Sequence, residues 1–226
     1  MQQASTQECE GKVPSEFPTR FVSVKCKKGT ETLADRTGAV LTKNFILTAF
    51  DGPTEEIKCQ IVKKDDTAPT GKYTREIEDI FTFEDDFEID NSRVPQIQIL
   101  KSKEADNRSI SLIAPMKLRK KYFLPKKQDC EVHTYDENEE LVEIEVTVES
   151  QEICQGYYAD LNTINICIKM PEDCNCMKLQ AGAGLECDDL LVGVVNDDLK
   201  CSPDKPRLAA DVNEARRWIA SEAWGY

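Results

Sequence analysis

Residues 38–52 read GAVLTKNFILTAFDG, and the assignment of the fold depends on them. Residues 39–48 of this stretch form one of several short β-rich runs bounded by Gly, Pro, Asp or Lys. The other runs are residues 20–25, 57–62, 97–100, 141–148 and 190–195. Polar and apolar side chains alternate over residues 143–149, which is the period of a strand with one solvent-exposed and one buried face. The chain is therefore expected to consist mainly of strands.

One helix is predicted, over residues 214–220 near the C-terminal end, with Asp211 or Asn213 as its cap. Val212, Ala215 and Ile219 share one apolar face of this segment. Residues 112–130 indicate a connection between two β units. Many short strands followed by one terminal helix favour paired barrels or a sandwich, and the pattern alone leaves both open.

The charge of the chain limits the classes of partner. Its 226 residues carry a formal net charge of −13, so the summed field repels phosphate backbones and anionic membranes. Neither nucleic acid nor a membrane is expected as a partner, and no run is apolar enough to span a bilayer. Basic residues gather at 117–127, either as an anion-binding patch or as a solvated connection.

Ten cysteines and one histidine are present, without a paired Cys-x-x-Cys pattern for zinc. An even number of scattered cysteines indicates disulfides and a secreted, extracellular protein. No metal and no cofactor are expected. Asn107, in Asn-Arg-Ser, is a candidate glycosylation acceptor and agrees with secretion.

Several stretches resemble the trypsin and chymotrypsin serine proteases. Residues 38–52 resemble the segment that leads to the catalytic histidine, usually LTAAHC, and residues 130–135, CEVHTY, resemble the start of the second barrel, usually CxVSGWG. Residues 187–201 resemble the segment after the GDSGGP nucleophile motif, and residues 211–219 resemble the closing helix. The resemblance covers roughly residues 9–224.

This resemblance implies an all-β fold of two packed antiparallel six-stranded barrels with a C-terminal helix. The N-terminal barrel and its leading segment would take residues 9–114, the connection residues 115–129, and the C-terminal barrel residues 130–226. Together they would form one trypsin-like domain.

Catalysis in this family needs a serine, a histidine that activates it and an aspartate that orients the histidine. The resemblance places Asp51 at the histidine position and Gln96 at the aspartate position. The nucleophile position falls on Ala181, or on Gln180 if the spacing is counted from the other side. Residues 177–186 contain no Ser, Thr or Cys, so none of them can act as the nucleophile. The sequence therefore predicts a homologue without protease activity.

The remaining features of an active protease are also absent from the pattern. His133, the single histidine, falls in the second barrel away from the triad and is expected to be structural. No IVGG-like start precedes Cys9, and Leu179 or Gln180 stands where the enzymes have the aspartate that binds the new N-terminus. The resemblance predicts that activation by cleavage does not occur.

The substrate pocket of the family has two walls of glycine, and the resemblance assigns these positions to Asp198 and Arg207. We hypothesise that the two side chains pair and fill the pocket, because a buried charge needs a partner. The alternative is that both side chains turn to solvent. The base of the pocket corresponds to Asn175 or its neighbour Cys174, so no specificity charge remains.

The resemblance also implies disulfides. Family positions pair Cys130 with Cys187, Cys154 with Cys167, and Cys176 with Cys201, while the bridge beside the catalytic histidine is missing from both its ends. Of the four remaining cysteines, we expect Cys26 to pair with Cys59, on neighbouring strands of the first barrel. That leaves Cys9 with Cys174.

The sequence resembles inactive members of this family, which in arthropods act as cofactors or decoys in defence cascades, and among which the inactivated paralogues of parasitic mites interfere with host complement. The resemblance therefore implies a monomeric, protein-binding regulator or decoy whose partners are defence-cascade or host plasma proteins. Two alternatives remain open: a secreted carrier or nutritive protein, and a weak hydrolase with a site rebuilt around Asp51.

Overall fold

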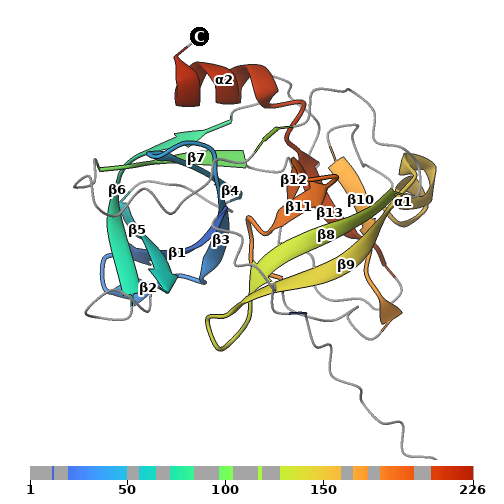
Figure 1. The fold of residues 1–226 in the computed structure, drawn as a ribbon, viewed down its shortest axis with the longest axis horizontal. Helices are drawn as coiled ribbons and strands as arrows, with labels where there is room; N and C mark the ends of the chain where they lie inside the picture. The colour runs from blue at the N-terminus through green and yellow to red at the C-terminus, as the bar shows by residue number, and fades with distance from the viewer. Residues whose placement is uncertain are drawn as a thin grey trace, which may run out of the picture.

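The computed structural model describes residues 12, 20–49, 56–64, 72–83, 97–103, 117–118, 128–158, 165–172, 179–195 and 205–225. These residues form two closed antiparallel β-barrels side by side, with a helix over one end (Figure 1). The predicted fold class is confirmed.

The first barrel contains the earlier strands of the chain. Its strands follow one another in space as β1 (Phe21–Lys28), β3 (Arg36–Val40), β4 (Phe45–Ala49), β7 (Ile97–Ser102), β6 (Lys72–Thr82) and β5 (Ile57–Lys64), and β1 pairs with β5 to close the barrel. The short strand β2 (Glu31–Thr32) pairs antiparallel with the end of β1. Every second side chain of the middle of β1 points into an apolar core that also contains Ile46 and Leu100, as the period of two requires; these side chains are Val22, Val24 and Cys26.

The second barrel repeats this closed arrangement. Its spatial order is β10 (Asn165–Lys169), β13 (Arg207–Asp211), β12 (Leu190–Val195), β11 (Gly184–Cys187), β8 (Gln128–Tyr135) and β9 (Leu141–Glu149). Val132, Ile144, Val146 and Leu185 fill its interior. The side chains that alternate with these on β8 and β9 therefore point away from the barrel interior, to the outer face of the sheet, where the candidate site lies.

All six cysteines within the described part of the chain form disulfides. Cys26 is bonded to Cys59 between β1 and β5, Cys130 to Cys187 between β8 and β11, and Cys154 to Cys167 between helix α1 (Gln151–Tyr157) and β10. These are three of the five expected pairs, and the other four cysteines lie outside the described residues. Such a density of disulfides is consistent with a secreted protein.

Each of the six predicted runs contains strand, but residues 39–48 do not form one continuous strand. They cover the end of β3 and most of β4, joined by a tight turn. In this turn the Thr42 hydroxyl oxygen accepts the backbone N–H groups of Asn44 and Phe45 at 3.3 and 3.2 Å. A threonine that bonds the backbone two and three residues ahead favours a turn over continued strand.

Helix α2 (Arg216–Trp224) begins and ends later than predicted. Neither Asp211 nor Asn213 caps it, because the N-cap residue is Ala215. The Asp211 carboxylate instead accepts the Asn213 N–H at 2.8 Å in the turn that precedes the helix. The predicted apolar face is buried, with Val212, Ala215 and Ile219 all packed in the core. Helix α1 was not predicted, since its seven residues include a glycine and carry little periodic signal.

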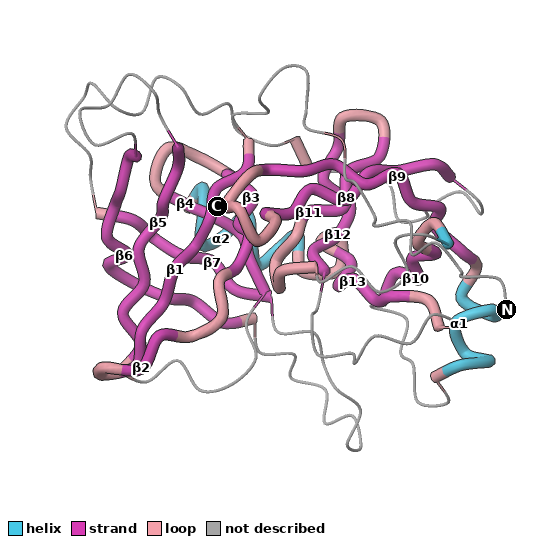
Figure 2. The backbone as a smooth tube through the Cα atoms, turned by 90° about the horizontal axis from the view of Figure 1, so that it is seen from below, coloured by secondary structure: helices cyan, strands magenta, loops and turns pink. Residues whose placement is uncertain are grey.

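One apolar cluster spans both barrels. It includes Phe21 and Leu47 of the first barrel, Tyr135 and Leu191 of the second, and Ile219 of α2. The view from below shows the strands of the two barrels meeting without an intervening layer (Figure 2). Among the residues that the structure describes, no helix is long and apolar enough to cross a lipid bilayer.

Candidate functional site

The turn between Leu179 and Gly184 contains the positions that the resemblance assigns to the nucleophile. Leu179 is fully buried in the second barrel, and the Gln180 N–H donates to the Thr134 hydroxyl at 3.1 Å. Thr37 on β3 donates its N–H to the Ala181 carbonyl at 3.0 Å and its hydroxyl to the Gln180 side-chain oxygen at 3.1 Å. The turn is thus bonded to both barrels.

Gly182 lets this turn approach the first barrel closely. Its φ is +79°, a left-handed conformation, and a Cβ there would lie 2.2 Å from both the Thr37 carbonyl oxygen and the Thr48 hydroxyl oxygen. Only glycine fits such a position without displacing backbone. Ala181, held beside it, carries a methyl group and has neither a nucleophilic atom nor a titratable proton.

The other predicted triad positions are bracketed by described strands. Ala49 at the end of β4 pairs with Ile97 at the start of β7. Asp51 and Gln96 themselves lie outside the described residues, as do Asn175, Asp198 and Asn107, so their roles remain predictions.

Arg207 opens β13 opposite Ile168 and is 7% exposed. Because its proposed partner Asp198 is not among the described residues, the ion pair that would fill the pocket also remains a prediction.

His133 lies on β8 at the contact between the barrels. Its ring stacks on Phe21 of β1, with centroids 4.5 Å apart and planes inclined by 18°. The histidine is 3% exposed. Its partner across the strands is Gly184, where a Cβ would lie 2.2 Å from the Phe21 ring, so the absence of a side chain there makes room for Phe21.

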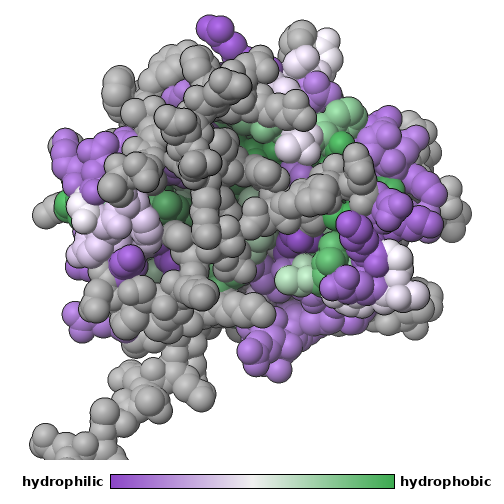
Figure 3. All heavy atoms as spheres, turned by 180° about the vertical axis from the view of Figure 1, so that it is seen from behind, coloured by the Kyte–Doolittle hydropathy of each residue, from purple (hydrophilic) through white to green (hydrophobic). Residues whose placement is uncertain are grey.

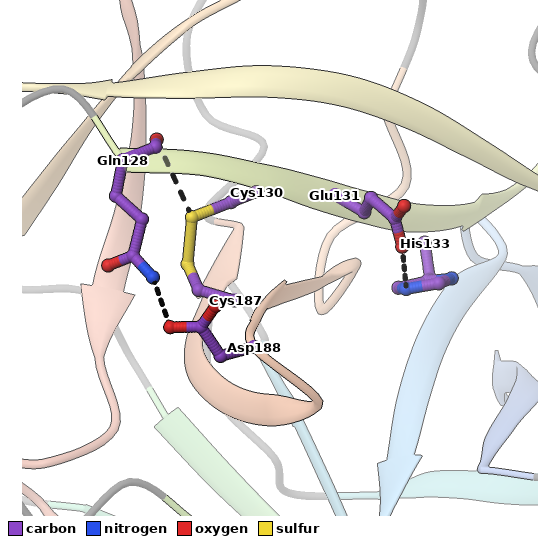
Figure 4. The surroundings of a disulfide bond; sticks show 6 residues. All are labelled: Gln128, Cys130, Glu131, His133, Cys187 and Asp188. Carbon is purple, nitrogen blue, oxygen red and sulfur yellow. Dashed lines mark hydrogen bonds and ion pairs between the residues drawn. A yellow bond between two sulfur atoms is a disulfide. The ribbon is translucent and has the colours of Figure 1, made fainter.

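Three carboxylates surround the His133 ring. Glu186 lies 3.5 Å and Glu131 3.8 Å from Nε2, and Glu143 lies 3.7 Å from Nδ1. Figure 4 shows Glu131 reaching the ring from two residues back along β8, beside the Cys130–Cys187 bridge. Arg20 donates to the second oxygen of Glu186 at 2.9 Å.

Burial controls the protonation of this cluster. Burial first, and then the Arg20 guanidinium, lowers the pKa of His133 to about 4, so the ring is neutral at pH 7. Burial also raises the pKa of Glu186 and of Glu143. Neither ring nitrogen has a hydrogen-bond partner among the described residues.

The cluster borders an acidic hollow of about 700 Å³ on the outer face of the second barrel. Eight of the residues that line it are Asp or Glu, among them Glu131, Glu186 and Asp189, against one lysine, Lys169. Seen from behind, much of the described surface is hydrophilic, with only small hydrophobic areas (Figure 3).

Sequence reasoning placed His133 in the second barrel and expected a structural role, but it did not identify the carboxylates. Glu131-Val132-His133 and Glu143-Ile144-Glu145 both alternate, so a hairpin joining them would have put Glu131, His133 and Glu143 on one face. Glu186 comes from β11, and only the pairing of β8 with β11 brings it there.

Comparisons with known proteins agree with this architecture. The sequence profile of the Trypsin family matches residues 16–219. The solved structure of GrC has a TM-score of 0.77 at 15% identity, covering 94% of this chain and 97% of its own. Scabies mite inactivated protease paralogue S-I1 has a TM-score of 0.70 at 23% identity, covering 90% of this chain and 93% of its own.

A second scabies mite inactivated protease paralogue, S-D1, has a TM-score of 0.74 at 15% identity and covers 92% of this chain and 93% of its own. At these identities the likeness concerns the fold alone. No curated protein matches the chain by sequence.

Proposed function

Because this chain belongs to the trypsin family, we propose that it is a secreted member without protease activity that acts by binding other proteins. Peptide hydrolysis in this family depends on a serine, a histidine and an aspartate acting as a unit. The proposal therefore rests on two observations: where the imidazole of this chain lies, and which side chains stand at the position of the nucleophile.

The position of the single histidine carries the proposal. The 226 residues include one histidine, and it is His133 on β8. The ring is buried against Phe21 and faces carboxylates, and no hydroxyl or thiol of the described residues forms a hydrogen bond with either ring nitrogen. No second imidazole exists that could serve as the general base.

The turn after Leu179 gives further support. Ala181 offers only a methyl group, and residues 177–186 contain no Ser, Thr or Cys. The two scabies mite neighbours are named as inactivated proteases and have the same fold, which supports a family architecture that persists without catalysis.

We further propose that the chain is a monomeric regulator or decoy in a proteolytic defence cascade. Loops on a rigid, disulfide-bonded β framework are suited to recognising other proteins. The formal net charge of −13 favours protein partners over nucleic acids or anionic membranes.

The absence of activity is tested with a panel of fluorogenic peptide and ester substrates and an active-site serine probe. We expect no turnover above that of the Asp51→Ala variant and no labelling. Turnover that disappears in Asp51→Ala would refute the proposal, because it would reveal a hydrolytic site rebuilt around that carboxylate.

The binding role is tested by adding the purified chain to a reconstituted proteolytic cascade and following zymogen activation. We expect the rate to change with the concentration of the folded chain but not with reduced and alkylated chain. An unchanged rate, together with no captured cascade component, would favour a carrier or nutritive protein instead.

A further inference from the structure

Four titratable side chains from three strands share one patch of the outer face of the second barrel. Glu131 and His133 are two residues apart on β8 and so point the same way. Glu143 on β9 is the cross-strand partner of His133, and Glu186 on β11 is the partner of Glu131. The register of the sheet therefore fixes the grouping.

The imidazole in this patch is buried without a hydrogen bond. The side chain of His133 is 4% exposed, and both nitrogens lack a hydrogen-bond partner within the described part of the chain. The carboxylate oxygens stand 3.5–3.8 Å away, too far for good hydrogen bonds. A buried polar group left in this way is unusual and calls for a ligand or another explanation.

The spacing fits a bound metal ion better than it fits direct contact. A tetrahedral zinc ion with bonds of about 2.0–2.2 Å holds its ligand atoms about 3.4 Å apart. The ligand atoms of Glu131, His133 and Glu143 lie within 4.8 Å of one another. Glu131 approaches Nε2 and Glu143 approaches Nδ1, so one of the two carboxylates would have to turn toward the nitrogen that binds the ion.

We propose that Glu131, His133 and Glu143 bind Zn²⁺ on the outer face of the second barrel. One imidazole and two carboxylates make a set that zinc accepts, and two carboxylates balance its charge. The Glu186 oxygen nearest Nε2 is the next ligand atom within reach, while Arg20 holds the other Glu186 oxygen in place.

The surroundings give a cation access to this set. The Glu131 side chain is 51% exposed, so the patch opens to solvent on its side. Glu131 and Glu186 also line the acidic hollow, whose field concentrates cations near the ligands. The hollow alone would attract Ca²⁺ and Mg²⁺ as well, whereas the imidazole favours a transition metal over these harder ions.

A metal here would act as a staple between strands. It would join β8 to β9 at the place where the His133 ring stacks on Phe21 of the first barrel. Because the unfolded chain does not assemble these ligands, binding would raise the unfolding temperature, and above the dissociation constant the gain in stability would grow with the logarithm of the free Zn²⁺ concentration. This inference does not depend on whether the chain is an enzyme.

The test uses full-length protein treated with EDTA and then titrated with Zn²⁺ alone. Because the chain has one histidine, labelling histidine with ¹⁵N gives a single imidazole to observe. We expect one ion per chain, a saturable shift of one of the two imidazole nitrogen signals, and a higher unfolding temperature. An excess of Ca²⁺ should not displace the ion.

Three variants separate a built site from general attraction. Glu131→Gln and Glu143→Gln should each weaken Zn²⁺ binding by at least about tenfold. Glu131 is half exposed, so its variant is expected to fold. Glu172→Gln, which removes a different carboxylate of the hollow, is the matched control and should bind as the unchanged chain does.

The inference is overturned if saturating Zn²⁺ leaves both imidazole signals in place. It is also overturned if Glu172→Gln weakens binding as much as Glu131→Gln, or if Ca²⁺ at equal concentration displaces the zinc. Either of the last two results would mean that the acidic hollow attracts cations without a site.

Discussion

Gly182 occupies the point where the turn after Leu179 meets the first barrel. Its positive φ and the two atoms 2.2 Å from a hypothetical Cβ leave no room for a side chain. We expect Gly182→Ala to lower the free energy of unfolding by about 2–4 kcal/mol, the sum of backbone strain and overpacking. Chemical denaturation measures the change.

Gly29 provides a matched control for that variant. It also has a positive φ, +59°, but nothing lies within 4 Å of a hypothetical Cβ. Gly29→Ala should therefore cost only the strain of the left-handed conformation, about 1–2 kcal/mol. Equal losses in the two variants would contradict the claim that the turn is held against β3 and β4.

Some features of individual site residues could be predicted from the sequence, and others could not. The absence of Ser, Thr and Cys from residues 177–186 could be predicted to remove the nucleophile, because the order of residues alone shows it. The contact of His133 with Phe21 is not, since it depends on how the two barrels pack. The grouping of Glu186 with Glu131 likewise requires the pairing of β11 with β8.

At the scale of elements, the hairpin between β8 and β9 reaches the first barrel. Glu139 in its turn forms ion pairs with Lys25 of β1 and Lys72 of β6. Hydrogen bonds from these two lysines lower the pKa of Glu139 to about 2, against an ordinary value of 4.5. The ionised carboxylate is thus favoured in the folded state.

This pair of contacts predicts a dependence of stability on pH. Because the folded pKa of Glu139 is the lower one, its contribution is present above about pH 4.5 and is lost as the pH falls towards 2. We expect Glu139→Gln to be less stable than the unchanged chain at pH 6. The difference in the free energy of unfolding should shrink as the pH falls from about 4.5 towards 2.

The size of this effect is limited by solvent. The Glu139 side chain is 35% exposed, so screening keeps its contribution at or below about 1 kcal/mol. Denaturation series at several pH values measure it, with Glu137→Gln on the same turn as the control. A difference between Glu139→Gln and the unchanged chain that stays constant from pH 6 to pH 2 would argue against the ion pairs.

Helix α2 gives a second prediction at this scale. Ile219 is fully buried in the cluster that both barrels share, and Trp218 packs beside Phe83. Ile219→Ala should lower the free energy of unfolding by about 2–5 kcal/mol through lost burial and a residual cavity. Arg217→Ala, on the exposed side of the same turn, should change it by less than about 0.5 kcal/mol.

The elements that the sequence predicted best are those with strong apolar runs. β12 and β9 were found with nearly their full lengths, because their side chains are buried or alternate cleanly. β6 was missed, since it carries charged residues and its side chains are mostly not buried. The split of residues 39–48 into β3 and β4 depends on the bonds of one threonine, which a run of apolar residues conceals.

At the scale of the whole molecule, the described disulfides lie within one barrel or the other, so the contact that the described residues make between the barrels is non-covalent. Cys26–Cys59 joins two strands of the first barrel, while Cys130–Cys187 and Cys154–Cys167 lie within the second. The barrels meet through the shared apolar cluster and the stacked pair of Phe21 and His133. A continuous core favours cooperative unfolding.

Phe21 tests whether the barrels unfold as one unit. It is 1% exposed, stacks on His133, and its backbone oxygen accepts the Tyr135 hydroxyl at 3.2 Å. We expect Phe21→Ala to lower the free energy of unfolding by about 3–5 kcal/mol while leaving a single transition, because both barrels lose the same contact.

Two probes distinguish cooperative from separate unfolding in this variant. Tryptophan fluorescence reports on α2, which contains both tryptophans of the chain, and the imidazole signal of His133 reports on β8. Coincident denaturation midpoints are expected for the unchanged chain and for Phe21→Ala. Separated midpoints in the unchanged chain would mean that the shared core does not couple the barrels, and the cost of Phe21→Ala would then fall on one probe alone.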